Sequence, residues 1–91
     1  MAEPYELVLM PTAVRALETK IKPAVAFALY EFMSGALCGD PRRLGKALKE
    51  PFLGYLSARR GEYRVIYRID DATHTVRVLM VDHRAGVYHP R

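Results

Sequence analysis

The stretch that decides the fold is GYLSARRGEYRVIYRIDD, which covers Gly54–Asp71. It predicts a β-hairpin, because tyrosine, valine and isoleucine favour strands and Arg60-Gly61 supplies a turn between them. Side chains of a strand point alternately to the two faces of a sheet. On the first strand, this alternation puts Tyr55, Ser57 and Arg59 on one face. On the second strand, one face carries Tyr63, Val65, Tyr67 and Ile69, and the other face carries Arg64, Ile66 and Arg68. We predict that the arginine-bearing face receives an anion, because guanidinium groups stay charged and bind phosphate oxygens.

The segments before the hairpin predict a strand and two helices. Tyr5–Met10 (YELVLM) predicts the first strand. Ala13–Lys20 predicts a short helix with Thr12 as its N-cap. A second helix is expected from Pro23, because apolar residues recur at helical spacing as far as Met33, and Gly35 and Gly39 are expected to end it. The two helices predict an αα-hairpin.

The segment after the hairpin predicts one more antiparallel strand, Thr75–Val81. Simple alternation places Val76, Val78 and Met80 on one face and Arg77, Leu79 and Val81 on the other. The predicted fold is therefore α+β, in the order β-α-α-β-β-β, with a small antiparallel-rich sheet and the N-terminal αα-hairpin packed on one face. We expect residues 1–91 to form one domain and the second face of the sheet to stay open.

Composition narrows the class of protein. The chain has 91 residues, 51% of them hydrophobic, and its 14 Lys and Arg against 10 Asp and Glu give a net charge of +4, which favours an anionic partner. Cys38 is the only cysteine, so we expect a buried thiol and a reducing compartment. The start of the chain lacks the pattern of a signal peptide, and the longest apolar run is too short to span a bilayer. These features predict a cytoplasmic protein without membrane contact.

A basic segment precedes the hairpin. Asp40–Pro51 contains four cations against two carboxylates, and the cations are Arg42, Arg43, Lys46 and Lys49. A charge run of this kind is compatible with a solvated surface, but its position just before the arginine hairpin favours a role in binding an anion. With these four residues we group Arg59. Surface ion pairs of Arg59 or Arg64 with Glu62 or Asp70 are the structural alternative.

Together with the order of elements, the segments LGKAL, GYLSARRGEYRVIYRIDD and VDHRAGVY resemble one family over nearly the whole chain. They are similar to the RelE-like branch of the RelE/ParE superfamily, the toxins of bacterial type II toxin–antitoxin systems. The resemblance implies ribosome-dependent cleavage of mRNA, with the ribosome and mRNA as targets and a cognate antitoxin as a partner in a hetero-oligomer. It also implies no metal and no cofactor.

The resemblance also implies residue roles. Arg64 matches the family's phosphate-binding arginine, Arg84 a second catalytic arginine, and Tyr88 a C-terminal tyrosine that orients the substrate. Tyr55 and Ser57 depart from the pattern, because the matching positions of the best-known branch are lysines. Ala47 stands near the glutamate base of the YoeB-like branch. We therefore take His83 as the candidate general base, because histidine titrates near neutrality.

Two other functions stay open. A ParE-like inhibitor of DNA gyrase without nuclease activity is favoured by the missing lysines and opposed by Arg64, His83, Arg84 and Tyr88. A degenerate member that only binds antitoxin is the third possibility, which the complete patterning of the chain opposes.

Overall fold

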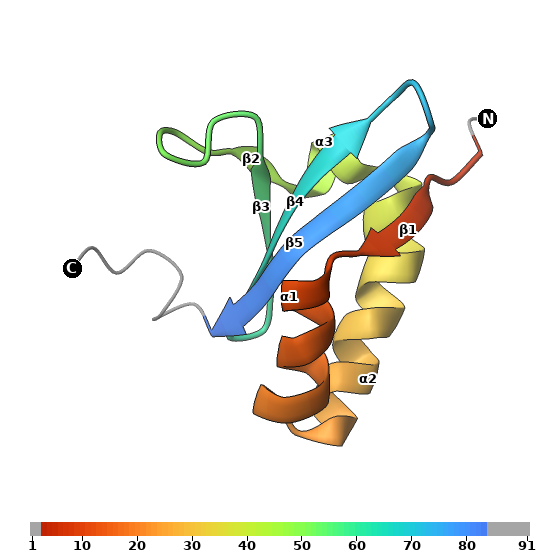
Figure 1. The fold of residues 1–91 in the computed structure, drawn as a ribbon. Helices are drawn as coiled ribbons and strands as arrows, with labels where there is room; N and C mark the ends of the chain where they lie inside the picture. Colours follow the sequence, from red (N-terminus) through yellow and green to blue (C-terminus); the bar gives the residue numbers. More distant parts are fainter. Residues whose placement is uncertain (1–2, 84–91) are drawn as a thin grey trace.

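The computed structural model describes residues 3–83 (Figure 1). Its elements are β1 (Glu6–Leu9), α1 (Pro11–Arg15), η1 (Ala16–Lys20), α2 (Pro23–Phe32), η2 (Met33–Leu37), α3 (Pro41–Leu44), β2 (Lys46–Ala47), β3 (Leu56–Arg60), β4 (Tyr63–Asp70) and β5 (Thr75–His83). The π-helical turns η1 and η2 continue α1 and α2. The predicted α+β class is confirmed. α3 and β2 were not predicted, since the sequence analysis placed no helix or strand within Asp40–Pro51.

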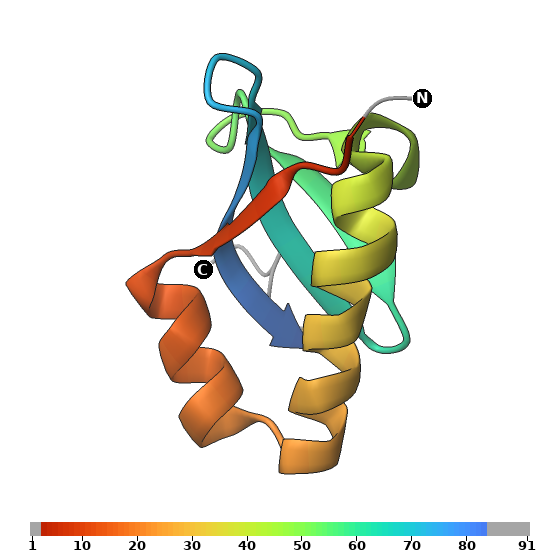
Figure 2. The same cartoon turned by 90° about the vertical axis from the view of Figure 1, so that its right-hand side faces the viewer.

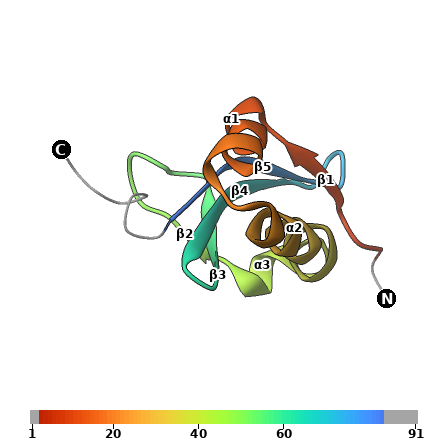
Figure 3. The same cartoon turned by 90° about the horizontal axis from the view of Figure 1, so that it is seen from below.

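The five strands form one mixed sheet in the order β1-β5-β4-β3-β2. β1 runs parallel to β5, and the other neighbours are antiparallel. α1 and α2 run in opposite directions and lie on the same face of the sheet (Figure 2), and the view from below shows both beside β4 and β5 (Figure 3). The predicted αα-hairpin on one face is therefore present.

Two helix boundaries differ from the prediction. The first helix begins at Pro11, not after a Thr12 cap, because Met10 takes the extended conformation that a residue before proline prefers, and proline fits the first helical position. The second helix passes through Gly35 as part of η2 instead of ending there. Glycine lowers helix stability by about 1 kcal/mol, but burial of Met33 and Leu37 against the sheet outweighs that local cost.

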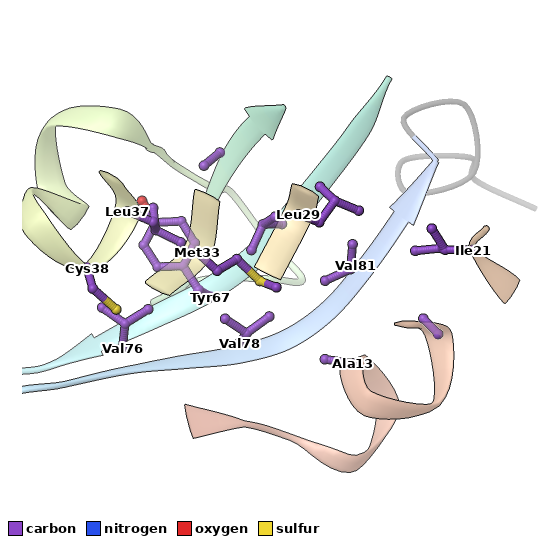
Figure 4. Packing of buried hydrophobic residues seen from close by; sticks show 13 residues of the cluster. Ala13, Ile21, Leu29, Met33, Leu37, Cys38, Tyr67, Val76, Val78 and Val81 are labelled. Atoms are coloured by element: carbon purple, nitrogen blue, oxygen red, sulfur yellow. The ribbon is translucent and has the colours of Figure 1, made fainter. Parts of the chain in front are cut away.

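The core lies between the helices and the sheet (Figure 4). Leu29, Met33 and Leu37 from the second helix face Tyr67 and the valines of β5, and each of these helical side chains is at most 1% exposed. Cys38 belongs to the same cluster, and burial raises the pKa of its thiol. The predicted buried cysteine is confirmed.

A β-bulge changes the faces of β5. Ile66 lies opposite Met80, but Tyr67 lies opposite Val78, so β5 contains one extra residue, Leu79, at this point. An extra residue shifts every following side chain to the other face. Val81 accordingly joins Val78 in the helix-side core. The predicted alternation, which put Val81 on the face opposite to Val78, is wrong for this reason.

The segment that carries α3 and β2 is attached to the sheet by one buried tyrosine. Tyr67 has no exposed surface, and its hydroxyl donates a 2.5 Å hydrogen bond to the carbonyl oxygen of Pro41. Burial raises the pKa of Tyr67 to about 12. Gly45 passes so close to this ring that a Cβ there would lie 2.0 Å from the Tyr67 oxygen. This close contact fixes the backbone immediately before Lys46.

Candidate functional site

A groove of about 630 Å³ lies on the face of the sheet opposite to the helices. We call it the basic groove, and its lining residues are Leu44, Lys46, Ala47, Leu48, Ser57, Arg59 and Arg64. The register explains how three cations meet there. Arg59 is directly opposite Arg64, and Lys46 is directly opposite Ser57, so their side chains share one face. The predicted joining of Ser57, Arg59 and Arg64 on one face is confirmed.

The electrostatics of the basic groove favour an anion. Like charges directly opposite each other on neighbouring strands destabilise a sheet. Arg59 and Arg64 are in that arrangement, and Lys46 adds a third positive charge. Arg64 is half-buried and its Nε atom is buried, so an anion that reached it would interact in a medium of lower dielectric than water. The groove can therefore bind phosphate with two guanidinium groups, an ammonium and a hydroxyl.

The sequence prediction missed one carboxylate at this site. Asp82 of β5 lies directly opposite Arg64, so it is on the open face beside the basic groove. It is exposed, and its Oδ1 accepts a 2.8 Å hydrogen bond from the backbone N–H of His83. Only the bulge at Leu79 brings this residue to the open face. Strict alternation from Val78 would have placed Asp82 with the core.

The structure does not bring His83 into the basic groove. His83 is directly opposite Tyr63, on the helix-side face. Its ring makes an edge-on contact with Tyr63, with centroids 5.6 Å apart, and its Nε2 lies 3.1 Å from Glu62 Oε1. His83 and Arg64 thus belong to opposite faces of the sheet.

The four predicted cations of the basic segment have different surroundings. Only Lys46 lines the basic groove. Arg42 forms an ion pair with Asp71, whose Oδ1 also accepts a 2.8 Å hydrogen bond from Tyr5. The Arg42 guanidinium holds the pKa of Asp71 below its usual range. Arg43 forms an ion pair with Asp40 at 2.9 Å, and both side chains are largely exposed.

Lys49 is exposed in the turn that follows β2, where its carbonyl oxygen accepts a 2.9 Å hydrogen bond from Phe52 N–H. The acidic residues that the sequence offered as partners for Arg59 and Arg64 make other contacts. Glu62 contacts His83, and Asp70 contacts Arg77 at 3.7 Å. Arg84 and Tyr88 lie outside the described residues.

Among residues 3–83, no three His, Cys, Asp or Glu side chains gather as ligands for a metal ion. In the same range, none of the helices combines the length and the apolar character needed to cross a bilayer.

Comparison with known proteins places the fold and the sequence in one family. Residues 11–88 match the family model described as the ParE toxin of the type II toxin–antitoxin system parDE. The chain is 47% identical to Toxin RelG of Mycobacterium tuberculosis over 85 residues, which is 93% of this chain and 97% of that protein. It is 41% identical to Toxin RelE of the same organism, over 93% of this chain and 87% of that protein.

Solved structures agree with the sequence relatives. The structure of the toxin–antitoxin complex RelBE2 from Mycobacterium tuberculosis contains a chain that matches with a TM-score of 0.87 and 46% identity, over 93% of this chain and 97% of that one. A chain of the Escherichia coli RelBE complex matches with a TM-score of 0.71 but only 20% identity, over 87% of this chain and 95% of that one, which shows a shared fold. The chain therefore belongs to the RelE/ParE superfamily, the toxins of type II toxin–antitoxin systems.

Proposed function

We propose that this toxin is a ribosome-dependent mRNA endoribonuclease that inhibits translation and is neutralised by a cognate antitoxin. One observation carries the proposal: Lys46, Arg59 and Arg64 surround Ser57 in a groove on the open face of the sheet. Three cations around one hydroxyl suit a phosphodiester, which carries one negative charge and accepts several hydrogen bonds. The two mycobacterial relatives, named RelG and RelE toxins, support the RelE-like branch.

The chemistry that this groove suits is attack of a ribose 2′-OH on the adjacent phosphate. The 2′-oxygen forms a new bond to phosphorus, the bond to the 5′-oxygen breaks, and the proton of the 2′-OH leaves to a base while the leaving oxygen gains one. Arg64 and Arg59 would stabilise the extra negative charge of the pentavalent phosphate, which is the role that preorganised donors play in such transition states. This mechanism relies on the 2′-OH, so it is restricted to RNA.

Several roles remain proposals. Arg84 as a second charge-stabilising residue and Tyr88 as the substrate-orienting residue are proposed from the family resemblance. His83 was the sequence-based candidate for the base, and its place on the helix-side face removes it from the set that lines the basic groove. Lys46 adds positive charge in this scheme. The proposed cleavage uses neither a metal ion nor a cofactor.

The partner proposal rests on the relatives. The solved RelBE2 and Escherichia coli RelBE structures are toxin–antitoxin complexes, so we propose that this chain also forms a hetero-oligomer with an antitoxin. A segment that covered the open face would block the basic groove. Neutralisation would then require no chemical change in the toxin.

The test is cleavage in a translating extract. The purified toxin is added, and the 5′ ends of the mRNA are mapped by primer extension. We expect cuts at the ribosomal A site, and none in naked mRNA. Arg64→Ala should lower cleavage about 100-fold or more, as removal of one oxyanion donor does in other enzymes. Lys22→Ala, an exposed position between the two helices, is the charge-matched control and should cut normally. Intact mRNA with the wild-type toxin would exclude the nuclease.

Inhibition of DNA gyrase is the second candidate function, because the family model that matches the chain is described as the ParE toxin. A supercoiling assay with purified gyrase separates the two functions. Loss of supercoiling together with intact mRNA would establish the ParE-like activity in place of the nuclease.

A further inference from the structure

A second pair of arginines faces the open side of the sheet, away from the basic groove. Arg68 of β4 is directly opposite Arg77 of β5. They line a small hollow of about 90 Å³, which we call the arginine hollow, together with Met10, Tyr55 and Leu79. The arginine hollow and the basic groove share no lining residue.

The arrangement of Arg68 and Arg77 needs an explanation beyond folding. Two like charges directly opposite each other on neighbouring strands destabilise the sheet. One carboxylate is close, since Asp70 lies 3.7 Å from Arg77, but Asp70 also accepts a hydrogen bond from Thr73 N–H. The Arg68 side chain is exposed, and within residues 3–83 it makes no ion pair or hydrogen bond. The hollow therefore keeps a net positive charge.

The basic groove and the arginine hollow lie at separate positions along β4, which indicates separate ligands. Arg64 and Arg68 are four residues apart in one strand, which is about 13 Å at 3.3 Å per residue. Ile66, which is fully buried, lies between them on the same face. Arg64 and Arg68 line different hollows, so each hollow offers a phosphate group its own site.

We propose that Arg68 and Arg77 form a second phosphate-binding subsite, which takes a different phosphodiester of RNA from the one in the basic groove. The proposal rests on the RNA-directed function given above. Tyr55 lines the same hollow, and aromatic rings next to cations are the usual surroundings of a single-stranded RNA backbone. The phosphodiester could belong to mRNA or to ribosomal RNA, which have the same chemistry at this group.

The test measures the salt dependence of RNA binding by the full-length toxin. Each phosphate contact with a single strand contributes about −0.7 to the slope of log K against log salt concentration. Binding of a short labelled single-stranded RNA is one arm, and cosedimentation with ribosomes over the same salt range is the other. Arg68→Gln should make this negative slope less steep by about 0.7 in at least one arm. Arg68→Lys should restore it, because lysine keeps the charge.

The two arms identify the source of the phosphate. A less steep slope of Arg68→Gln with the free oligonucleotide supports mRNA as the source of the phosphate. A less steep slope only with ribosomes supports ribosomal RNA. Arg15→Gln, on the helical layer, is the control for a lost arginine. Unchanged slopes of Arg68→Gln in both arms, with the protein folded, would overturn the subsite. The nuclease proposal is refuted by a different result, namely that wild-type toxin leaves mRNA uncut in the extract.

Discussion

Replacement of Gly45 by alanine should destabilise the protein through one contact. The backbone of Gly45 has φ −119°, which alanine also adopts, so the cost is purely steric. The new Cβ would lie 2.0 Å from Tyr67 Oη and 2.8 Å from Cζ, whereas ordinary contacts begin near 3.4 Å. Either the ring or the segment before Lys46 must move by more than an ångström.

The expected magnitude has two parts. Overpacking of a filled core costs about 1–3 kcal/mol. A shift of this size also breaks the 2.5 Å hydrogen bond from Tyr67 to Pro41 and leaves a buried carbonyl oxygen unsatisfied, at about 1–3 kcal/mol. We expect Gly45→Ala to lower the free energy of unfolding by about 2–6 kcal/mol and Tm by about 10 °C or more. Thermal unfolding followed by circular dichroism measures both.

A double-mutant cycle tests the physical reason. Tyr67→Phe removes the oxygen that the new methyl group would overlap, so Gly45→Ala should cost at least about 1 kcal/mol less in that background. Gly35→Ala is the matched control, because its Cβ meets nothing within 4 Å and the position is helical, so stability should rise by about 0.5–1 kcal/mol. Additive effects of Gly45→Ala and Tyr67→Phe would refute the steric contact.

Three further predictions concern titration and the site. His83→Gln should retain mRNA cleavage within a few-fold and leave its pH profile unchanged, because His83 faces away from the basic groove; a loss of about 100-fold would assign it the base role. Asp71→Asn should flatten the acid limb of the stability curve. Arg42 lowers the folded pKa of Asp71, so the stabilisation is complete above the ordinary pKa and is lost as the pH falls through the folded value; an unchanged limb in urea unfolding would contradict this. At high pH, the buried Tyr67 ionises later than the unfolded tyrosine, so stability should fall above about pH 10 and less so in Tyr67→Phe, as Tm measured between pH 9 and 11 would show.

Local sequence patterns were sufficient for the hairpin and for its faces. The turn at Gly61, where φ is +62°, and the pairing of Arg59 with Arg64 follow from glycine and from strand alternation, both of which depend on a few neighbouring residues. The helical layer was also predictable, because the apolar spacing from Pro23 to Met33 is a local signal. The ends of the helices were not, since burial of Leu37 decides whether the chain continues past Gly35.

The site depended on contacts between distant residues. Tyr67 and Pro41 are 26 positions apart, and their hydrogen bond places Lys46 at the basic groove. The ion pair between Arg42 and Asp71 joins α3 to the turn between β4 and β5, which no local pattern connects.

The sequence by itself determined the superfamily, the α+β class and the face that carries Arg59 and Arg64. The tertiary structure alone decided which face His83 and Asp82 occupy, because one extra residue in β5 exchanges the two faces of the strand beyond Leu79. Nothing in a period-two pattern marks such a bulge, since its position depends on how β4 and β5 pair across the sheet.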